Sequence, residues 1–358
     1  MSDKPTQQLH DAGQSLWLDN ITRMMLADGT LAGYIEELSV TGLTSNPTIF
    51  DKAIGAGDAY NEQIATDGPG AASTEDLFFE LAIRDLRGAT DLFAPVHART
   101  DGVDGFCSLE VSPLLADDTA ATTAQAAQLH AKAERDNLFI KIPGTGAGLK
   151  AIEDSIFAGI PINVTLLFST DHYLASADAY MSGIERRVEA GLDPNVASVA
   201  SLFISRWDAA VAGKEVPDNL RNWLGIAVGW HCFRAYHELL DSERWQRLLN
   251  EGARPQRLLW ASTGTKDPDA SDVLYIEKLA APFTVNTMPE NTLKAFADHG
   301  NVGYLVPTDG VRADQMLAEF ETAGIGVDAL AARLQEEGKQ SFVKSWTDLL
   351  ETIERQLS

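Results

Sequence analysis

The sequence predicts an α/β protein, a single (β/α)8 TIM barrel with helical insertions and a C-terminal helical extension. The chain has 358 residues, of which 45% are hydrophobic, so it can bury one large core. Short apolar or β-branched runs alternate with helical patterns along it, which is typical of parallel strands joined by crossover helices. We find eight such runs, the number that closes a barrel.

The predicted strands leave long segments between them. In chain order the strands are Ser15–Asp19, Ser39–Asn46, Gly105–Ser112, Leu138–Pro143, Pro161–Ser169, Ala197–Ser205, Arg257–Thr263 and Phe283–Thr287. Barrels of this kind typically take about 250 residues, so roughly a hundred residues must lie in insertions or extensions. We therefore expect one domain over residues 1–358, with helical insertions near 49–99 and 207–254 and a C-terminal helical region at 312–358.

The C-terminal segment carries one apolar stripe at helical spacing, formed by Phe342, Trp346, Leu349, Leu350 and Ile353. We expect this stripe to pack against the barrel. A dimer interface and a lid over a site are the alternatives.

Composition restricts the partners and the compartment. The chain has 28 basic and 52 acidic residues, a net charge of −24, which argues against binding to nucleic acid or to an anionic membrane. Only Cys107 and Cys232 are present, so we expect a reducing compartment and no disulfide framework. The start lacks an apolar signal core, and no apolar run approaches the ~18 residues of a membrane span. A cytoplasmic protein is expected.

Lys141 is the most informative residue, because it interrupts the apolar strand Leu138–Pro143. Burial disfavours the charged form of a lysine and lowers its pKa, which yields a neutral amine that can form a Schiff base with a carbonyl. The alternative is a lysine that extends from the strand end into solvent.

Other polar residues interrupt the predicted strands near their C-terminal ends, where barrel enzymes place their active sites. They are Asp19, Thr44, Asn46, Glu110, Asn163, Thr165, Ser201, Ser262 and Lys266. Phe203 shares a strand face with Ser201 and is included as a candidate substrate-binding residue. Unpaired charges inside a barrel cost several kcal/mol each, so this convergence favours a functional site.

Two carboxylates and one guanidinium have both a functional and a structural interpretation. Asp19 and Glu110 suit acid/base catalysis beside a Schiff-base lysine, whereas a helix N-cap or a buried ion pair is the structural alternative. Arg206 follows a strand end, where it can clamp a phosphate or form an ordinary salt bridge at the rim.

Neither a nucleotide motif nor a metal motif is found. The stretch Gly144–Lys150 matches neither the dinucleotide fingerprint nor the Walker loop, so we expect a tight strand-to-helix turn with Lys150 on a solvated helix face. No pair of histidines has the His-Glu-x-x-His spacing. The sequence predicts an enzyme without metal or other cofactor.

Five segments resemble the transaldolase family, in its branch with a longer C-terminal region, over nearly the whole chain. They are Leu16–Arg23 (LWLDNITR), Gly42–Phe50 (GLTSNPTIF), Phe139–Thr145 (FIKIPGT), Ile162–Ser169 (INVTLLFS) and Val285–Pro289 (VNTMP). The resemblance implies transfer of a dihydroxyacetone unit between sugar phosphates through a lysine Schiff base. The implied ketoses are fructose 6-phosphate and sedoheptulose 7-phosphate, and the implied aldoses are erythrose 4-phosphate and glyceraldehyde 3-phosphate.

The catalytic roles follow residue by residue from this resemblance. Lys141 would form the Schiff base, and Asp19 would serve as acid/base for the C4 hydroxyl. Glu110 and Thr165 would hold the catalytic water.

The substrate-binding roles follow in the same way. Asn46 and Asn163 would orient substrate hydroxyls, and Thr44 would line the pocket. Ser201 and Arg206 would bind the phosphate.

The seventh strand departs from the family pattern, because an arginine after Ala-Ser-Phe in many members is replaced here by Ala261-Ser262-Thr-Gly-Thr-Lys266. Lys266 is a point charge without the planar fork of arginine, so we expect weaker or differently placed phosphate contact.

Two other functions compete with this interpretation. A fructose-6-phosphate aldolase on the same fold would release free dihydroxyacetone. In those aldolases the positions that resemble Glu110 and Phe203 tend to hold glutamine and tyrosine, so this chain favours transfer. A non-catalytic phosphosugar-binding barrel is the second competitor. The expected partners are small sugar phosphates, and the expected state is a monomer or homodimer.

Overall fold

The computed structural model describes residues 4–357 and contains one sheet of eight parallel strands, with neighbours in the order β2-β1-β8-β7-β6-β5-β4-β3. The strands are β1 (Ser15–Asp19), β2 (Val40–Thr44), β3 (Cys107–Glu110), β4 (Leu138–Pro143), β5 (Ile162–Leu167), β6 (Ser198–Phe203), β7 (Arg257–Ala261) and β8 (Val285–Met288). Each overlaps one predicted run.

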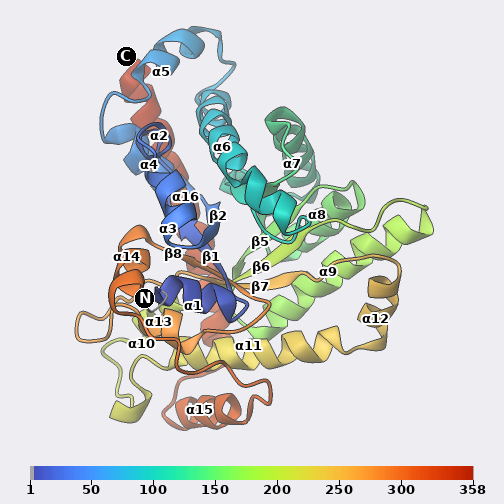
Figure 1. Cartoon of the computed structure of the whole chain (residues 1–358), viewed down its shortest axis with the longest axis vertical. Coiled ribbons are helices and arrows are strands. Elements are labelled where there is room, and N and C mark those ends of the chain that lie inside the picture. Colours follow the sequence, from blue (N-terminus) through green and yellow to red (C-terminus); the bar gives the residue numbers. More distant parts are fainter. Residues whose placement is uncertain (1–3, 358) are drawn as a thin grey trace.

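Backbone hydrogen bonds between the two ends of the sheet close the circle. Leu43 N donates to the carbonyl of Phe106, and Gly105 N donates to the carbonyl of Thr41, both at 2.9 Å. The strands lie at the centre of the molecule with helices around them (Figure 1). The predicted (β/α)8 barrel is confirmed.

The helices fill the segments between strands and the C-terminal tail. They are α1 (Pro5–Asp11), α2 (Arg23–Ala27), α3 (Thr30–Glu37), α4 (Pro47–Gly55), α5 (Asn61–Asp67), α6 (Thr74–Arg99), α7 (Thr119–Ala133), α8 (Gly146–Phe157), α9 (Thr170–Glu189), α10 (Ser205–Val211), α11 (Leu224–Leu240), α12 (Glu243–Asn250), α13 (Leu274–Lys278), α14 (Glu290–His299), α15 (Val311–Thr322) and α16 (Val327–Leu357). Within residues 4–357, none of them combines the length and the apolar composition that a bilayer crossing requires.

Side-chain caps fix the points where helices begin after the strands. Asn46 accepts a hydrogen bond from Ile49 N at the start of α4, which is why β2 ends before the predicted bound. Thr22 caps α2 by accepting from Met25 N. The alternative interpretation of Asp19 as the cap of this helix is therefore wrong.

The turn from β4 into α8 is tight and needs its glycines for space. A Cβ on Gly148 would lie 1.9 Å from the carbonyl oxygen of Pro143, and one on Gly144 would lie 2.4 Å from Leu167 Cδ2. Thr145 caps the helix, and the exposed Lys150 forms salt bridges with acidic neighbours on α8. The predicted strand-to-helix turn and the solvated position of Lys150 are confirmed.

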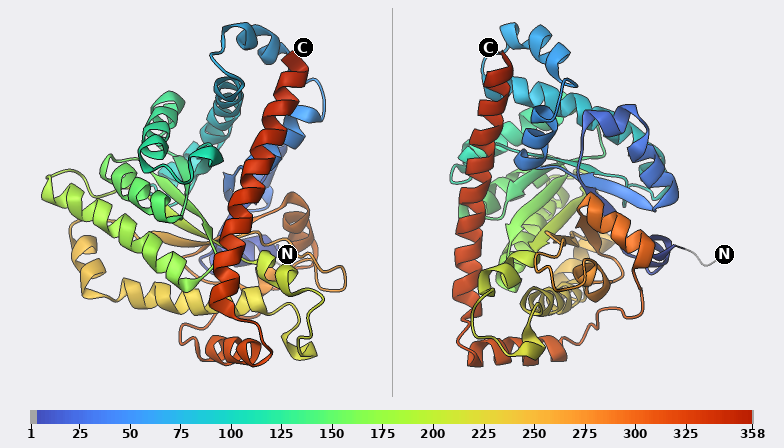
Figure 2. Two further views of the ribbon diagram at one scale, coloured as in Figure 1. Left: turned by 180° about the vertical axis from the view of Figure 1, so that it is seen from behind. Right: turned by 90° about the vertical axis from the view of Figure 1, so that its left-hand side faces the viewer.

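The long helix α16 packs against the rest of the chain through the predicted apolar stripe. Trp346 is buried, and its ring centroid lies 5.1 Å from that of Phe78 and 5.6 Å from that of Phe79, both on α6. Leu349 and Ile353 are fully buried. Figure 2 shows α16, in red, running along one side of the molecule from the C terminus towards α15.

Candidate active site

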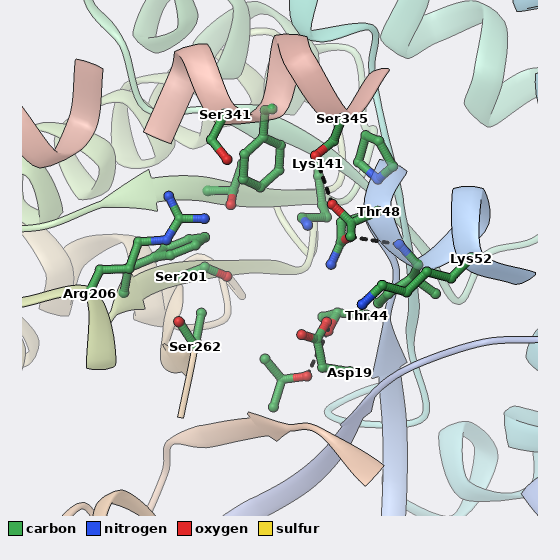
Figure 3. A pocket seen from close by; sticks show the side chains of 18 of the residues that line it. Asp19, Thr44, Thr48, Lys52, Lys141, Ser201, Arg206, Ser262, Ser341 and Ser345 are labelled. Carbon is green, nitrogen blue, oxygen red and sulfur yellow. Dashed lines mark hydrogen bonds between the residues drawn. The ribbon is translucent and has the colours of Figure 1, made fainter. Parts of the chain in front are cut away.

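A cavity of about 320 Å³ opens at the C-terminal ends of the strands, beneath α16 (Figure 3). Its volume suits a ligand of the size of a small sugar phosphate. Ten of the twelve predicted site residues line it: Asp19, Thr44, Asn46, Lys141, Thr165, Ser201, Phe203, Arg206, Ser262 and Lys266. The other two, Glu110 and Asn163, are buried behind this wall and hydrogen-bond to residues that form it.

Lys141 reaches the cavity from the middle of β4 and is only 6% exposed. Its Nζ donates to the carbonyl oxygen of Ser45 at 3.0 Å and to Glu110 Oε2 at 3.3 Å. Figure 3 shows the amine directed into the cavity. The alternative of a lysine that extends into solvent is wrong, because the barrel encloses the whole side chain.

Glu110 is the buried partner of this amine. Register places Glu110 of β3 directly beside Lys141 of β4, and the parallel strands point both side chains to the same face. Burial raises the pKa of the Glu110 carboxyl, and the charge of Lys141 opposes this rise. Glu110 is therefore suited to take a proton from the amine when a substrate carbonyl arrives.

Asp19 ends β1 on the opposite wall from Arg206 (Figure 3). The hydroxyl of Thr44 donates to Asp19 Oδ1 at 2.7 Å, so the hydroxyl of Thr287, 2.7 Å from that of Thr44, is the donor to Thr44. Burial raises the pKa of Asp19, while the Thr44 hydrogen bond and the charges of Lys141 and Lys266 lower it. This relay holds the carboxylate in one orientation towards the cavity.

Asn163 acts on the cavity through Ser201. The hydroxyl of Ser201 donates to Asn163 Oδ1 at 2.7 Å, and Asn163 Nδ2 donates to Ser108 Oγ at 3.1 Å. On the same strand, Thr165 Oγ1 is buried and forms no hydrogen bond within residues 4–357. Since Thr165 lines the cavity, its hydroxyl is available to a ligand or a water.

Arg206 lies at the start of α10 with its guanidinium 5.2 Å from the ring centroid of Phe203. Burial lowers its pKa, and the charges of Glu110 and Glu337 oppose this. Within residues 4–357, Arg206 forms no salt bridge closer than 4.0 Å. The rim salt bridge considered from the sequence is absent from this part of the chain, and the fork faces the cavity (Figure 3).

Ser262 and Lys266 line the same cavity as Arg206, from the segment after β7. The Ser262 hydroxyl lies 2.9 Å from that of Ser205, which begins α10 and does not line the cavity. Lys266 is exposed at the cavity mouth, and its charge reaches Asp19.

Several lining residues were not among the predicted site residues, namely Pro47, Thr48, Ile49, Lys52, Ala261, Thr287, Ser341, Phe342 and Ser345. Thr287 lies at the end of a predicted strand, so its hydroxyl could have identified it as a candidate site residue. Phe342 was recognised only as part of an apolar stripe. Lys52 and Ser345 lie on helices, where a solvated side chain gives no sequence signal of a site.

No group of three or more His, Cys, Asp or Glu side chains in residues 4–357 is arranged to hold a metal ion. The cavity instead carries a net positive set of side chains, with Lys52, Lys141, Arg206 and Lys266 against Asp19. Such a lining favours an anionic ligand.

Comparison with known proteins agrees with this geometry. The family model described as Transaldolase/Fructose-6-phosphate aldolase matches residues 16–353. A protein named Transaldolase from Thermobifida fusca (strain YX) is 44% identical over 362 residues, which cover 99% of this chain and 98% of the relative. Another named Transaldolase, from Arthrobacter sp. (strain FB24), is 45% identical with the same coverage. The chain belongs to the transaldolase/fructose-6-phosphate aldolase family.

Proposed function

We propose that this chain is a transaldolase of the pentose phosphate pathway. It transfers a dihydroxyacetone unit from sedoheptulose 7-phosphate or fructose 6-phosphate to glyceraldehyde 3-phosphate or erythrose 4-phosphate. The observation that carries the proposal is the amine of Lys141, which lies inside a cavity beside the buried carboxylate of Glu110 and shares that cavity with Asp19. An enclosed lysine with carboxylates nearby that can accept and donate protons is suited to covalent catalysis on a carbonyl group.

Schiff-base formation begins when the Lys141 amine attacks C2 of the ketose. The amine must first lose a proton, and Glu110, 3.3 Å away with a raised pKa, is the acceptor that the geometry supports. Loss of water from the carbinolamine then gives an iminium. Thr165, with its unpartnered buried hydroxyl, is suited to hold that water together with Glu110.

Cleavage of the C3–C4 bond follows from the position of Asp19. Its carboxylate takes the proton of the C4 hydroxyl, and the electron pair of the breaking bond moves into the iminium. The aldose phosphate leaves, and a three-carbon enamine stays on Lys141. Attack of this enamine on a second aldehyde reverses the same steps and completes the transfer.

The phosphate would bind at the wall of the cavity that lies opposite Asp19. The unpaired guanidinium of Arg206 can grip two phosphate oxygens, and Lys266 adds a mobile point charge at the mouth. Ser262 and Ser201, which also line the cavity, would add hydroxyl contacts to the phosphate. Asn46 and Asn163 would orient the hydroxyls of the sugar.

Borohydride reduction in the presence of fructose 6-phosphate tests the proposal. We expect intact-mass and peptide mass spectrometry to find a stable three-carbon or six-carbon adduct on Lys141, and added erythrose 4-phosphate to yield sedoheptulose 7-phosphate. Lys141→Ala should lower turnover at least about a thousandfold without unfolding. Lys150→Ala, which changes a solvated lysine, is the matched control.

Three results would contradict the proposal. Near-normal turnover by Lys141→Ala would remove the covalent mechanism. An adduct accompanied only by release of free dihydroxyacetone would indicate the aldolase. The absence of any adduct would return Lys141 to a structural role.

We also propose a cytoplasmic location and a monomeric or homodimeric state. The proposed substrates are cytoplasmic metabolites, which supports the location. Light scattering of the purified protein would distinguish the two states and exclude larger assemblies.

A further inference from the structure

One face of α16 points towards the barrel from Gln335 to Gln356. This face is formed by residues that recur at intervals of three and four positions: Gln335, Gly338, Phe342, Ser345, Leu349, Thr352 and Gln356. Such spacing places them in one line on a helix. Three polar residues of this face, Gln335, Ser345 and Thr352, form hydrogen bonds with other parts of the chain.

Hydrogen bonds fix α16 on both sides of the cavity mouth. Gln335 donates to the carbonyl oxygens of Gly144 and Leu166, at the ends of β4 and β5, at 3.2 and 3.0 Å. On the other side, Thr352 donates to Asp51 at 2.7 Å, in α4. Between these anchors, Thr48 donates to Ser345 at 2.8 Å, directly at the cavity wall.

Phe342 lies between the two anchors and covers the amine. Its ring centroid is 5.9 Å from Lys141 Nζ, and the residue lines the cavity. Of the three α16 residues in the lining, Ser341 and Ser345 are small and polar, so Phe342 is the one that brings a large apolar surface over the reactive nitrogen. Figure 3 shows Ser341 and Ser345, on either side of Phe342 in the sequence, along the roof of the cavity.

We propose that Phe342 is a specificity-determining residue that decides the fate of the enamine. This inference rests on the proposed transaldolase function. The enamine carbon C3 can attack an aldehyde, which is transfer, or take a proton from water, which leads to release. After protonation, water adds to C2 of the iminium and the C2–N bond breaks, which frees dihydroxyacetone and returns the amine to Lys141. The apolar ring, 5.9 Å from the nitrogen, hinders the entry of bulk water to the enamine.

The test compares Phe342→Ala with wild type in two assays. The first measures cleavage of fructose 6-phosphate by the initial burst of glyceraldehyde 3-phosphate, and the second measures free dihydroxyacetone in the absence of an acceptor. We expect the burst rate to change by less than about threefold, and steady release to rise about tenfold, because only the barrier for water entry is lowered. With erythrose 4-phosphate present, a smaller fraction of the cleaved donor should be transferred.

Two variants control for packing. Val343→Ala removes methyl groups from the adjacent residue of α16, which does not line the cavity, and should leave the partition unchanged. Phe342→Leu retains apolar volume and should release dihydroxyacetone at a rate between those of wild type and Phe342→Ala. This second variant also preserves the test if the alanine protein does not fold.

Unchanged release by a folded Phe342→Ala protein would overturn the inference, and so would a rise of the same size in Val343→Ala. Failure of the transaldolase proposal is recognised separately. In that case wild type itself forms no borohydride-reducible adduct on Lys141.

Discussion

The Lys141–Glu110 pair shows how a single contact joins stability to chemistry. Both side chains are buried, and both lose hydration that their attraction only partly replaces. A hydrophobic pair of similar size would fill the same space at lower cost. In the proposed mechanism the pair offsets this cost by giving the amine a proton acceptor within hydrogen-bonding distance, for which the raised pKa of Glu110 is suited.

Asp19 gives a prediction about the pH dependence of activity. The carboxylate must be ionised to accept the C4 hydroxyl proton, and its raised pKa means that activity falls as the pH drops through that raised value. Thr44→Val removes a hydrogen bond that favours the ionised form. Because a hydrogen bond to a charged group contributes about 1.5 kcal/mol, the acid limb of kcat/KM should move up by about one pH unit.

A full pH profile of both proteins checks this shift. Thr41→Val is the matched control, because Thr41 lies on the same strand but directs its hydroxyl to the carbonyl of Leu16. Its acid limb should stay where the wild-type limb lies. An unmoved limb in Thr44→Val would mean that a group other than Asp19 sets the acid side of the profile.

At the scale of elements, α16 meets the end of β5 and the start of α10 around one glycine. A Cβ on Gly338 would lie 3.0 Å from Leu166 Cδ2 and 3.4 Å from Arg206 Nη1. Glycine in a helix interior costs up to about 1 kcal/mol relative to alanine, so the sequence gives up helix stability here. The space gained lets α16 pass over Arg206 without pushing the guanidinium out of the cavity.

Gly338→Ala should therefore separate substrate binding from stability. The added methyl group crowds Leu166 Cδ2 at 3.0 Å and comes into contact with Arg206 Nη1 at 3.4 Å, which restricts the guanidinium. We expect KM for fructose 6-phosphate to rise by up to about fivefold while kcat stays within about twofold, since the contact to phosphate is made in both ground and transition state. The thermal midpoint should be unchanged or higher, because alanine favours the helix.

Steady-state kinetics and thermal unfolding measure these two effects. Gly57→Ala serves as the control, because a Cβ there meets no atom within 4 Å. An unchanged KM in Gly338→Ala would show that Arg206 tolerates the methyl group or does not bind the phosphate.

At the scale of the whole molecule, the charge of the cavity lining is opposite in sign to the net charge of the chain. The chain carries a net charge of −24, yet the cavity wall presents Lys52, Lys141, Arg206 and Lys266 against Asp19. A net negative charge disfavours polyanionic partners, whereas the positive side chains of the cavity favour a small anionic ligand. Net charge and site charge therefore serve different purposes.

Trp346 tests whether barrel and tail unfold together. It joins α16 to Phe78 and Phe79 of α6, more than 250 residues earlier in the chain. Truncating a buried tryptophan typically costs about 3–5 kcal/mol. For Trp346→Ala we expect one transition at a lower urea concentration, coincident by circular dichroism and by donor cleavage.

The control is Leu357→Ala, at the exposed end of the same helix, which should shift the midpoint much less. Loss of activity at a urea concentration where the circular dichroism of the barrel is intact would contradict the expectation. It would show that α16 detaches as a separate unit, and that the single domain over residues 1–358 is the wrong description.

The sequence alone determined the barrel and most of its active wall. Eight apolar runs predicted eight strands, because a parallel strand buried on both faces must be apolar throughout, and a polar residue within it stands out. A barrel brings the C-terminal ends of all strands to one rim, so Lys141, Asp19 and Thr165 could be placed together without knowledge of a single distance.

Only the tertiary structure decided what lies behind and above that wall. Glu110 and Asn163 lie behind it, since period-two alternation gives the face of a strand but not the depth of a side chain. Phe342 belonged to a stripe that predicted burial without naming the partner, because helical periodicity records that a face is covered and not what covers it. Its position over Lys141 arises from a contact across about 200 residues, which no local pattern in the sequence specifies.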